Sequence, residues 1–345
     1  MREKRLSEIG EKKLVEMLVD LLRSDWRCND LPPGDDAACV SLPGGAKLLV
    51  KIDGFSVSSV KLPWMTLYDV GWKAVVATAS DLVAKGGRPL VFLVSIGLRR
   101  DDRAADALEL VKGARDAAKA VGAWLAGGDT NAAGDPWIDT AGVATPVRIV
   151  APRVRNGDLI YTTVGRYGLT GLAFHIMRRG DTSEIYSYPE ALRATTRPLP
   201  RLEFLSLLEE VGECITWAGD VSDGLCATLR NLHTISEHRI ILDALPPLHP
   251  EAIEYAESHR LDISELILYG GEEYEIVFTV ARGCETHVER AANRLGLRIA
   301  RIGFVVPKSI TSSIHTERVS ESSWIPINSC LERVSTGWDQ FKGWA

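Results

Sequence analysis

Aspartate recurs in this sequence at points where an apolar stretch meets a turn. In the first case, Pro33-Gly34-Asp35-Asp36, a Gly-led turn carries two carboxylates into an apolar run. One Asp in such a place usually accepts hydrogen bonds from the backbone of its own turn. Several carboxylates gathered together repel one another unless cations neutralise them, and oxygen ligands suit hard cations such as Mg²⁺. The pattern therefore predicts a cation site, and it comprises Asp35, Asp36, Asp53, Asp81, Asp129, Asp220 and Asp223.

Stretches with strand and helix character alternate along the chain. In the first half, residues 47–52 and 90–96 are predicted strands, and residues 68–85 and 104–121 are predicted helices. A further helix is expected over residues 7–23, with Ser7 as its N-cap. The second half mixes both kinds of element in the same way. This alternation predicts an α/β or α+β fold.

The chain is long enough for two domains. At about 150 residues per domain, 345 residues suffice for two cores. The sequence Ala-Pro-Arg-Val-Arg-Asn-Gly-Asp at residues 151–158 breaks the apolar pattern and is the best boundary. We expect an N-terminal domain over residues 1–150 and a C-terminal α+β domain over residues 151–345.

Composition excludes several classes of protein. A net charge of -6 with scattered basic residues argues against a nucleic-acid-binding face. No apolar run approaches the roughly 20 residues that a membrane-spanning helix needs, and the charged N-terminus has no signal-peptide core. The six cysteines form no Cys-x-x-Cys pair, and several lie in apolar runs, which predicts buried thiols in a reducing compartment. We therefore expect a cytoplasmic protein.

Phosphate-binding motifs are nearly absent. The chain has no Gly-x-x-x-x-Gly-Lys-[Ser/Thr] loop and no Gly-x-Gly-x-x-Gly fingerprint. Gly165-x-x-Gly168-x-x-Gly171 lies between a predicted strand and a predicted helix. Its backbone N–H groups could bind phosphate, or the glycines could form a tight turn, and the sequence leaves both readings open.

Seven short motifs occur along the chain: Gly34-Asp35-Asp36-Ala37-Ala38, Asp53, Lys73 to Ala84 with Ser80-Asp81, Gly127-Gly128-Asp129-Thr130, Asn156-Gly157-Asp158, Asp220-Val221-Ser222-Asp223-Gly224 and Gly270-Gly271-Glu272-Glu273-Tyr274. Their order is the one found in thiamine-monophosphate kinases, and Gly337 to Phe341 resembles that family's ending. The sequence resembles an archaeal-type member of that family over essentially its whole length.

The resemblance implies a fold and an activity. The fold would be that of the aminoimidazole-ribonucleotide-synthetase-like superfamily, with an N-terminal domain that dimerises through its sheet. ATP and several Mg²⁺ would bind in the cleft between the domains. The reaction would be direct in-line transfer of the ATP γ-phosphoryl group to thiamine monophosphate. Because the acceptor phosphate is already ionised, no catalytic base is required.

The same resemblance assigns roles to single residues. Glu272 and Trp338 would contact the thiamine substrate. The family's ATP-contacting arginine aligns with Ala151 when no gap is allowed, so Arg153 or Arg148 would have to supply it. ATP would touch Gly128, Asp129 and Ser222, and the metal ligands would be Asp35, Asp36, Asp53, Asp81, Asp129, Asp220 and Asp223.

The chain also departs from the family pattern. The segment after Asp53 lacks the usual Glu and His, and Lys85 stands where Met is usual. These departures leave two alternatives open. The protein could act on another acceptor within the same superfamily, or it could bind ATP or thiamine phosphate without catalysis.

Overall fold

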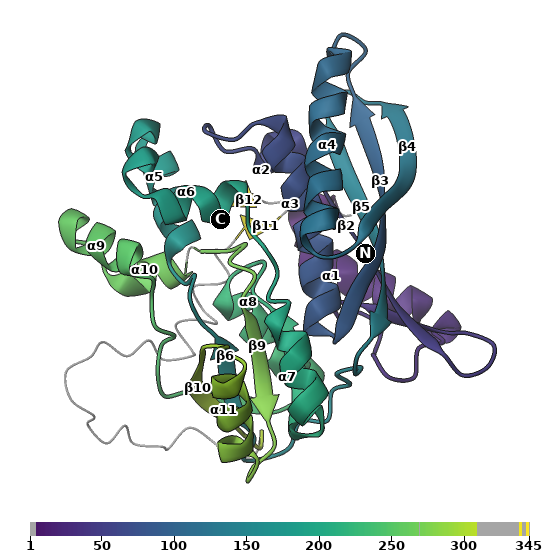
Figure 1. The fold of residues 1–345 in the computed structure, drawn as a ribbon, viewed down its shortest axis with the longest axis vertical. Helices are drawn as coiled ribbons and strands as arrows, with labels where there is room; N and C mark the ends of the chain where they lie inside the picture. The colour runs from purple at the N-terminus through teal and green to yellow at the C-terminus, as the bar shows by residue number, and fades with distance from the viewer. Residues whose placement is uncertain (1–4, 269, 309–337, 340–342, 345) are drawn as a thin grey trace.

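The computed structural model describes residues 5–268, 270–308, 338–339 and 343–344. Two five-stranded sheets dominate it, one from each half of the chain (Figure 1). Helices pack on both sheets, so the expected mixed α/β architecture is confirmed. Residues 147–158, which connect the two sheets, contain no helix or strand. The domain boundary near residue 150 stays a prediction.

The first sheet has the strand order β1-β2-β5-β3-β4. β3 and β4 run parallel, and the other neighbours run antiparallel. Along β3, Phe92, Val94 and Ile96 are buried on the face that α3 and α4 cover, as period-2 alternation requires. The elements are β1 (Ala38–Ser41), β2 (Lys47–Ser56), β3 (Gly87–Leu98), β4 (Trp124–Ala132), β5 (Trp137–Pro146), α3 (Leu67–Ala84) and α4 (Ala104–Ala120).

Two glycines allow α3 and α4 to pack closely. A Cβ atom on Gly71 would lie 1.9 Å from the backbone oxygen of Leu110, and one on Gly113 would lie 1.9 Å from that of Tyr68. Any side chain at either position would push the helices apart. This contact fixes α3, which carries residues of the site described below.

The second sheet has the order β7-β9-β6-β10-β8 and is antiparallel. α7 and α11 pack on one face, where Phe204 and Val288 join Phe278 in one apolar cluster. α8 packs on the other face through Leu229, beside Trp217. The elements are β6 (Leu159–Thr163), β7 (Ile215–Asp220), β8 (Arg239–Leu242), β9 (Ile276–Val280), β10 (Ile299–Val306), α7 (Glu203–Val211), α8 (Leu225–Ser236) and α11 (Glu285–Arg294).

The remaining elements lie around these two layers. Four helices, α5 (Leu169–Arg179), α6 (Pro189–Thr196), α9 (Pro250–His259) and α10 (Ile263–Leu268), share one apolar cluster. The others are α1 (Leu6–Leu22), α2 (Val57–Val60), short 3-10 turns at Arg23–Asp25, Thr182–Ser187 and Gly212–Cys214, and the paired strands β11 (Trp338–Asp339) and β12 (Gly343–Trp344). Among the described residues, no helix has the length and apolar character to cross a membrane.

Several elements differ from the sequence-based predictions, among them α1, β4 and β7. α1 begins one residue earlier than expected, and its N-cap is Arg5 instead of Ser7. β4 continues through Asp129 to Ala132, so Asp129 lies within a strand and not where a strand meets a turn. β7 was not predicted, because all six of its residues are buried and show no alternation.

The prediction of buried free thiols is wrong for most of the cysteines. Cys28 and Cys39 form one disulfide, and Cys214 and Cys284 form another, with Cα–Cα distances of 5.1 Å and 5.8 Å. Cys226 is also disulfide-bonded. Partners 11 and 70 residues apart come together only through the tertiary fold. The cysteines therefore give no support to a reducing compartment, and the cytoplasmic location stays a prediction.

Candidate metal and nucleotide site

Three carboxylates from distant parts of the chain meet where the two halves of the chain pack together. Asp36 lies in the loop before β1, Asp81 in the last turn of α3, and Asp220 at the end of β7. One oxygen atom from each residue lies within 4.8 Å of the other two. The end of α3 reaches β7 because Ala84 packs in the same apolar cluster as Ala218. We call Asp36, Asp81 and Asp220 the acidic cluster.

A buried lysine lies beside the acidic cluster. The Nζ atom of Lys85 is 2.5 Å from Oδ1 of Asp35 and 3.2 Å from Oδ2 of Asp36. It also donates a hydrogen bond of 2.6 Å to the backbone oxygen of Ala218. The side chain of Lys85 is completely buried. The nearby carboxylates raise the pKa of Lys85 despite the opposing effect of burial, so the amine stays charged.

A second lysine, Lys51 in β2, contacts another carboxylate of the cluster. The Nζ atom of Lys51 is 2.6 Å from Oδ2 of Asp81 and 3.3 Å from Oδ1 of Asp53. Its side chain keeps some contact with solvent. Asp53 is thereby joined to the acidic cluster through an ammonium group.

Burial disfavours the charged form of the carboxylates in the cluster. The pKa of Asp81 rises to about 7, first because burial removes water from the carboxylate and then because Asp53 is close. Burial, followed by the charges of Asp81 and Asp36, raises the pKa of Asp220 well above its usual range. Such carboxylates bind either a proton or a cation.

The acidic cluster fits a divalent cation. Oδ2 of Asp220 is buried and has no hydrogen-bond partner among the described residues. Two further carboxylates approach it, so several oxygen atoms converge on one point. Mg²⁺ takes oxygen ligands of this kind and keeps some of its waters. The predicted ligands Asp36, Asp81 and Asp220 are thus brought together, whereas Asp35 is paired with Lys85.

The loop after β7 supplies two more of the predicted residues. The Oγ atom of Ser222 donates a hydrogen bond of 3.3 Å to Oδ1 of Asp220. The pKa of Asp223 rises to about 6, first through desolvation and then through the charges of Glu11, Asp81 and Glu272. The chain turns there at Gly224, whose φ of +92° suits glycine. Ser222 and Asp223 therefore lie at the edge of the acidic cluster.

Glu272 lies close to this loop. Its backbone N–H donates a hydrogen bond to the oxygen of Ser222, and its Oε2 lies 2.6 Å from Nζ of Lys73 in α3. Trp338 begins β11, but its side chain lies outside the described residues, so its predicted substrate contact stays untested. Arg153 binds the other end of β7, where its Nη2 donates to the oxygen of Ile215 at 3.2 Å. The structure therefore does not bring Arg153 to the acidic cluster.

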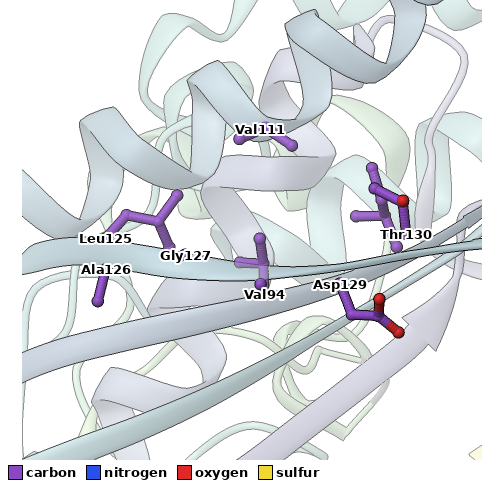
Figure 2. Close-up of a pocket in the computed structure, with 9 residues that line it drawn as sticks. Val94, Val111, Leu125, Ala126, Gly127, Asp129 and Thr130 are labelled. Atoms are coloured by element: carbon purple, nitrogen blue, oxygen red, sulfur yellow. The ribbon is translucent and has the colours of Figure 1, made fainter.

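Asp129 lies apart from the acidic cluster. The strand register runs from Asp53 through Thr140 and Val94 to Gly128, which puts β2 and β4 about 14 Å apart at ~4.8 Å per strand. The Asp129 side chain points to the side of β4 opposite to Thr130 and to Val111 of α4 (Figure 2). Within one chain, Asp129 therefore cannot share a cation with Asp53 or the acidic cluster.

A pocket of about 320 Å³ lies between β3, β4 and α4. It is lined mainly by apolar residues, including Val94, Val111 and Leu125 (Figure 2). Gly128 also lines it. A Cβ atom on Gly128 would lie 1.7 Å from the backbone oxygen of Val94, so the close approach of β4 to β3 requires glycine there. The pocket holds the predicted nucleotide-contacting Gly128 and Asp129 but none of the acidic cluster.

The glycine loop at residues 165–171 is a turn bound by side chains. The backbone N–H of Gly168 donates to Oε1 of Glu273 at 2.7 Å, and that of Arg166 donates to Oε1 of Glu275 at 2.9 Å. A Cβ atom on Gly171 would lie 1.9 Å from the oxygen of Leu266, so this glycine serves helix packing. Buried carboxylates occupy the donors that a phosphate would need. The turn reading is therefore the one that the structure supports.

Sequence reasoning assigned no role to three polar residues at the site. Lys51 and Lys73 stand inside otherwise apolar elements, where a charged side chain needs a partner, and this placement was the available signal. Asn231 in α8 donates a hydrogen bond of 3.2 Å from Nδ2 to Oδ1 of Asp36. No local pattern distinguishes Asn231 from an exposed helical residue.

Comparison with known proteins shows which family the chain belongs to. Residues 34–145 match the AIR synthase related protein family, N-terminal domain. A thiamine-monophosphate kinase from Pyrobaculum calidifontis is 32% identical over 237 residues, which cover 69% of this chain and 75% of that protein. The chain belongs to the thiamine-monophosphate kinase family. In the present chain, residues 34–145, which match the family's N-terminal domain, include Asp36, Asp53, Asp81 and Asp129.

Two solved structures share the fold of the present chain. The crystal structure of tt0281 from Thermus thermophilus is 38% identical, has a TM-score of 0.80, and matches 88% of this chain and 96% of that one. AaThiL complexed with AMPPCP and TMP is 25% identical, has a TM-score of 0.77, and matches 89% of this chain and 94% of that one. Both similarities span both sheets of the present fold.

Proposed function

We propose that this protein transfers the γ-phosphoryl group of ATP to the phosphate of thiamine monophosphate, giving thiamine diphosphate. The observation that carries the proposal is the convergence of Asp36, Asp81 and Asp220 from three distant segments. Membership of the kinase family supports it, as does a relative that binds AMPPCP, an ATP analogue, together with TMP. The two departures after Asp53 concern the acceptor and leave the acidic cluster intact.

Mg²⁺ bound at the acidic cluster would neutralise the phosphate oxygens between which the phosphoryl group moves. Asp36, Asp81 and Asp220 would hold it, with Asp53 and Asp223 beside them. Lys51, partly open to solvent, would add positive charge at the edge of the site. The acceptor phosphate of thiamine monophosphate is ionised at neutral pH, so the chain has to orient the two substrates in line and need not provide a base. Ser222 would contact ATP and Glu272 the acceptor.

A homodimer formed through the first sheet would complete the nucleotide site. The face of this sheet opposite α3 and α4 carries a row of Ile52, Ala141 and Leu93 across three adjacent strands. Ile52 and Leu93 are 66% and 47% exposed in the single chain, which is unusual for aligned apolar side chains. Asp129 lies on this same face, so in the dimer it would lie at the subunit interface. The predicted contacts of Gly128 and Asp129 with ATP would then be made at that interface.

Replacing Leu93 with arginine should convert the dimer into monomers, because the charge would be buried in the interface. Light scattering coupled to size-exclusion chromatography measures the change. The matched control is Leu108→Arg on α4, where the leucine is 72% exposed on the far side of the layer. The control should remain dimeric. A wild-type protein that is monomeric at all concentrations would contradict the dimer.

One assay tests the function directly. Purified protein is mixed with Mg²⁺-ATP and thiamine monophosphate, and thiamine diphosphate is quantified by chromatography. Product formation is the expected result. Formation of ADP only with another acceptor would favour a different enzyme of the same superfamily. Tight ATP binding without any product would favour a non-catalytic binding protein.

The metal-free protein should lose the stability that the carboxylates of Asp81 and Asp223 contribute as the pH rises from about 4 to about 7. The pKa values of Asp81 and Asp223 are about 7 and about 6 in the folded chain, above the ordinary value of 3.8. The folded state therefore holds protons that the unfolded state has released. Their stabilisation is present at low pH and is lost as the pH rises through these values. Mg²⁺ should restore stability at the higher pH, because it replaces the protons as counter-charge.

Melting temperatures in EDTA and in Mg²⁺, taken at each pH, measure this effect. The Asp81→Asn variant is the matched control, since it removes the carboxylate with the higher of the two pKa values. Its melting temperature in EDTA should depend less on pH. A wild-type protein whose stability in EDTA is greatest near pH 8 would contradict the prediction.

A further inference from the structure

The ammonium group of Lys85 is surrounded by oxygen atoms in the way that a bound metal cation would be. Its Nζ atom is surrounded by Oδ1 of Asp35, Oδ2 of Asp36 and the backbone oxygen of Ala218, at 2.5, 3.2 and 2.6 Å. The ring of Trp217 lies on a further side, with its centroid 5.2 Å from Nζ. Three oxygen atoms and an aromatic face make a site selective for positive charge. The site is completely enclosed, because the side chain of Lys85 has no exposure to solvent.

The backbone also favours a cation there. Lys85 is the C-cap residue of α3, and its N–H donates to the backbone oxygen of Asp81 one turn earlier. The C-terminal end of a long helix carries partial negative charge, which stabilises a cation within its last turn. Asp81 and Lys85, four residues apart, lie on the same side of the helix. The ammonium group is thus held next to the acidic cluster.

Asp36 is shared between this lysine and the acidic cluster. Its Oδ2 lies beside Lys85, and it also contributes a ligand oxygen to the group with Asp81 and Asp220. Asp35 is different, because its Oδ1 contacts Lys85 and its buried Oδ2 has no hydrogen-bond partner among the described residues. The cation that pairs with Asp35 is therefore the side chain of Lys85.

We propose that the ammonium group of Lys85 is a built-in counter-ion that occupies a cation position formed by Asp35 and Asp36, in place of a divalent metal ion. Asp35 then serves to bind Lys85, and divalent cations bind only on the other side of Asp36, at Asp81 and Asp220. This inference rests on the proposed magnesium site. It implies that the carboxylate of Asp36 stays in position when no metal is bound. It also implies that the chain binds one divalent ion fewer than a chain with an uncharged residue at position 85.

The Lys85→Met variant tests the proposal without any nucleotide or thiamine. Methionine has a similar length and no charge, so it opens the position between Asp35 and Asp36. Both proteins are stripped with EDTA, and Mn²⁺ bound per chain is counted by electron paramagnetic resonance of the free ion. We expect the variant to bind one more Mn²⁺ than the wild type. Its melting temperature in EDTA should be lower by about 10 °C, and Mn²⁺ should restore most of this loss.

The double variant Asp35→Asn/Lys85→Met is the matched control. It removes a carboxylate together with the lysine, so the extra Mn²⁺ should disappear while the protein stays folded in EDTA. A folded Lys85→Met protein with the wild-type ion count would overturn the proposal. The proposal also fails if Lys85→Met stays unfolded in excess Mn²⁺, whether or not the double variant folds, because a metal ion should replace the lysine charge. A wild-type protein that binds no Mn²⁺ at all would instead contradict the proposed magnesium site.

Discussion

Replacing Asp220 with asparagine is expected to slow thiamine diphosphate formation on the order of 10³-fold, because one charged metal ligand is lost. Asp220 ends β7, is 6% exposed, and has a carboxylate oxygen without a hydrogen-bond partner among the described residues. Asparagine keeps the size of the side chain and removes the charge that burial disfavours. The variant should therefore fold as well as the wild type while it binds Mg²⁺ more weakly.

Initial rates over a range of Mg²⁺ and ATP concentrations measure this loss, and the melting temperature reports the fold. Asp135→Asn is the matched control, since Asp135 lies in an exposed pair with Arg99 at 3.8 Å. An exposed ion pair contributes at most about 1 kcal/mol to stability, so this variant should stay folded. Its activity should remain within about twofold of the wild type. An Asp220→Asn variant with normal rates and normal Mg²⁺ dependence would remove Asp220 from the metal site.

Replacing Arg201 with methionine is expected to lower the free energy of unfolding by about 3–5 kcal/mol, because it leaves a buried carboxylate without its charge partner. Glu275 is completely buried and accepts hydrogen bonds from Nε of Arg201 at 2.6 Å and from Oγ1 of Thr163 at 2.5 Å. It also accepts the backbone N–H of Arg166, so this carboxylate joins β6, the glycine turn and the start of β9. Urea denaturation of both proteins in the same buffer measures the difference.

Two further variants separate the burial of the charge from the loss of an arginine in general. Arg294→Met removes an exposed ion pair with Glu210 at 2.6 Å and should cost at most about 1 kcal/mol. Arg201→Met/Glu275→Gln removes both charges and should recover part of the stability, because no buried charge remains. If the double variant is no more stable than Arg201→Met, the packing of the arginine and not its charge is what stabilises this region.

Local sequence patterns predicted most of the elements that hold the site. α3, β3 and α4 appeared within a few residues of their expected positions, since apolar periodicity depends on neighbours along the chain. β7, which carries Asp220, was missed because a fully buried strand shows no alternation. The disulfides were missed because no local pattern encodes which cysteines approach each other.

The sequence by itself determined the chemistry of the protein: aspartates at the ends of its elements, an order of motifs that resembles the thiamine-monophosphate kinases, and elements of mixed α/β type. Only the tertiary structure decided which of these residues meet. Asp36, Asp81 and Asp220 converge because the end of α3 packs against β7, whereas Asp129 lies on the other side of the first sheet, with two strands between β2 and β4. The structure also decided that Lys85 pairs with Asp35. The physical reason is that residue type and periodicity are local properties, while the distance between two side chains depends on strand order and on how the two halves pack.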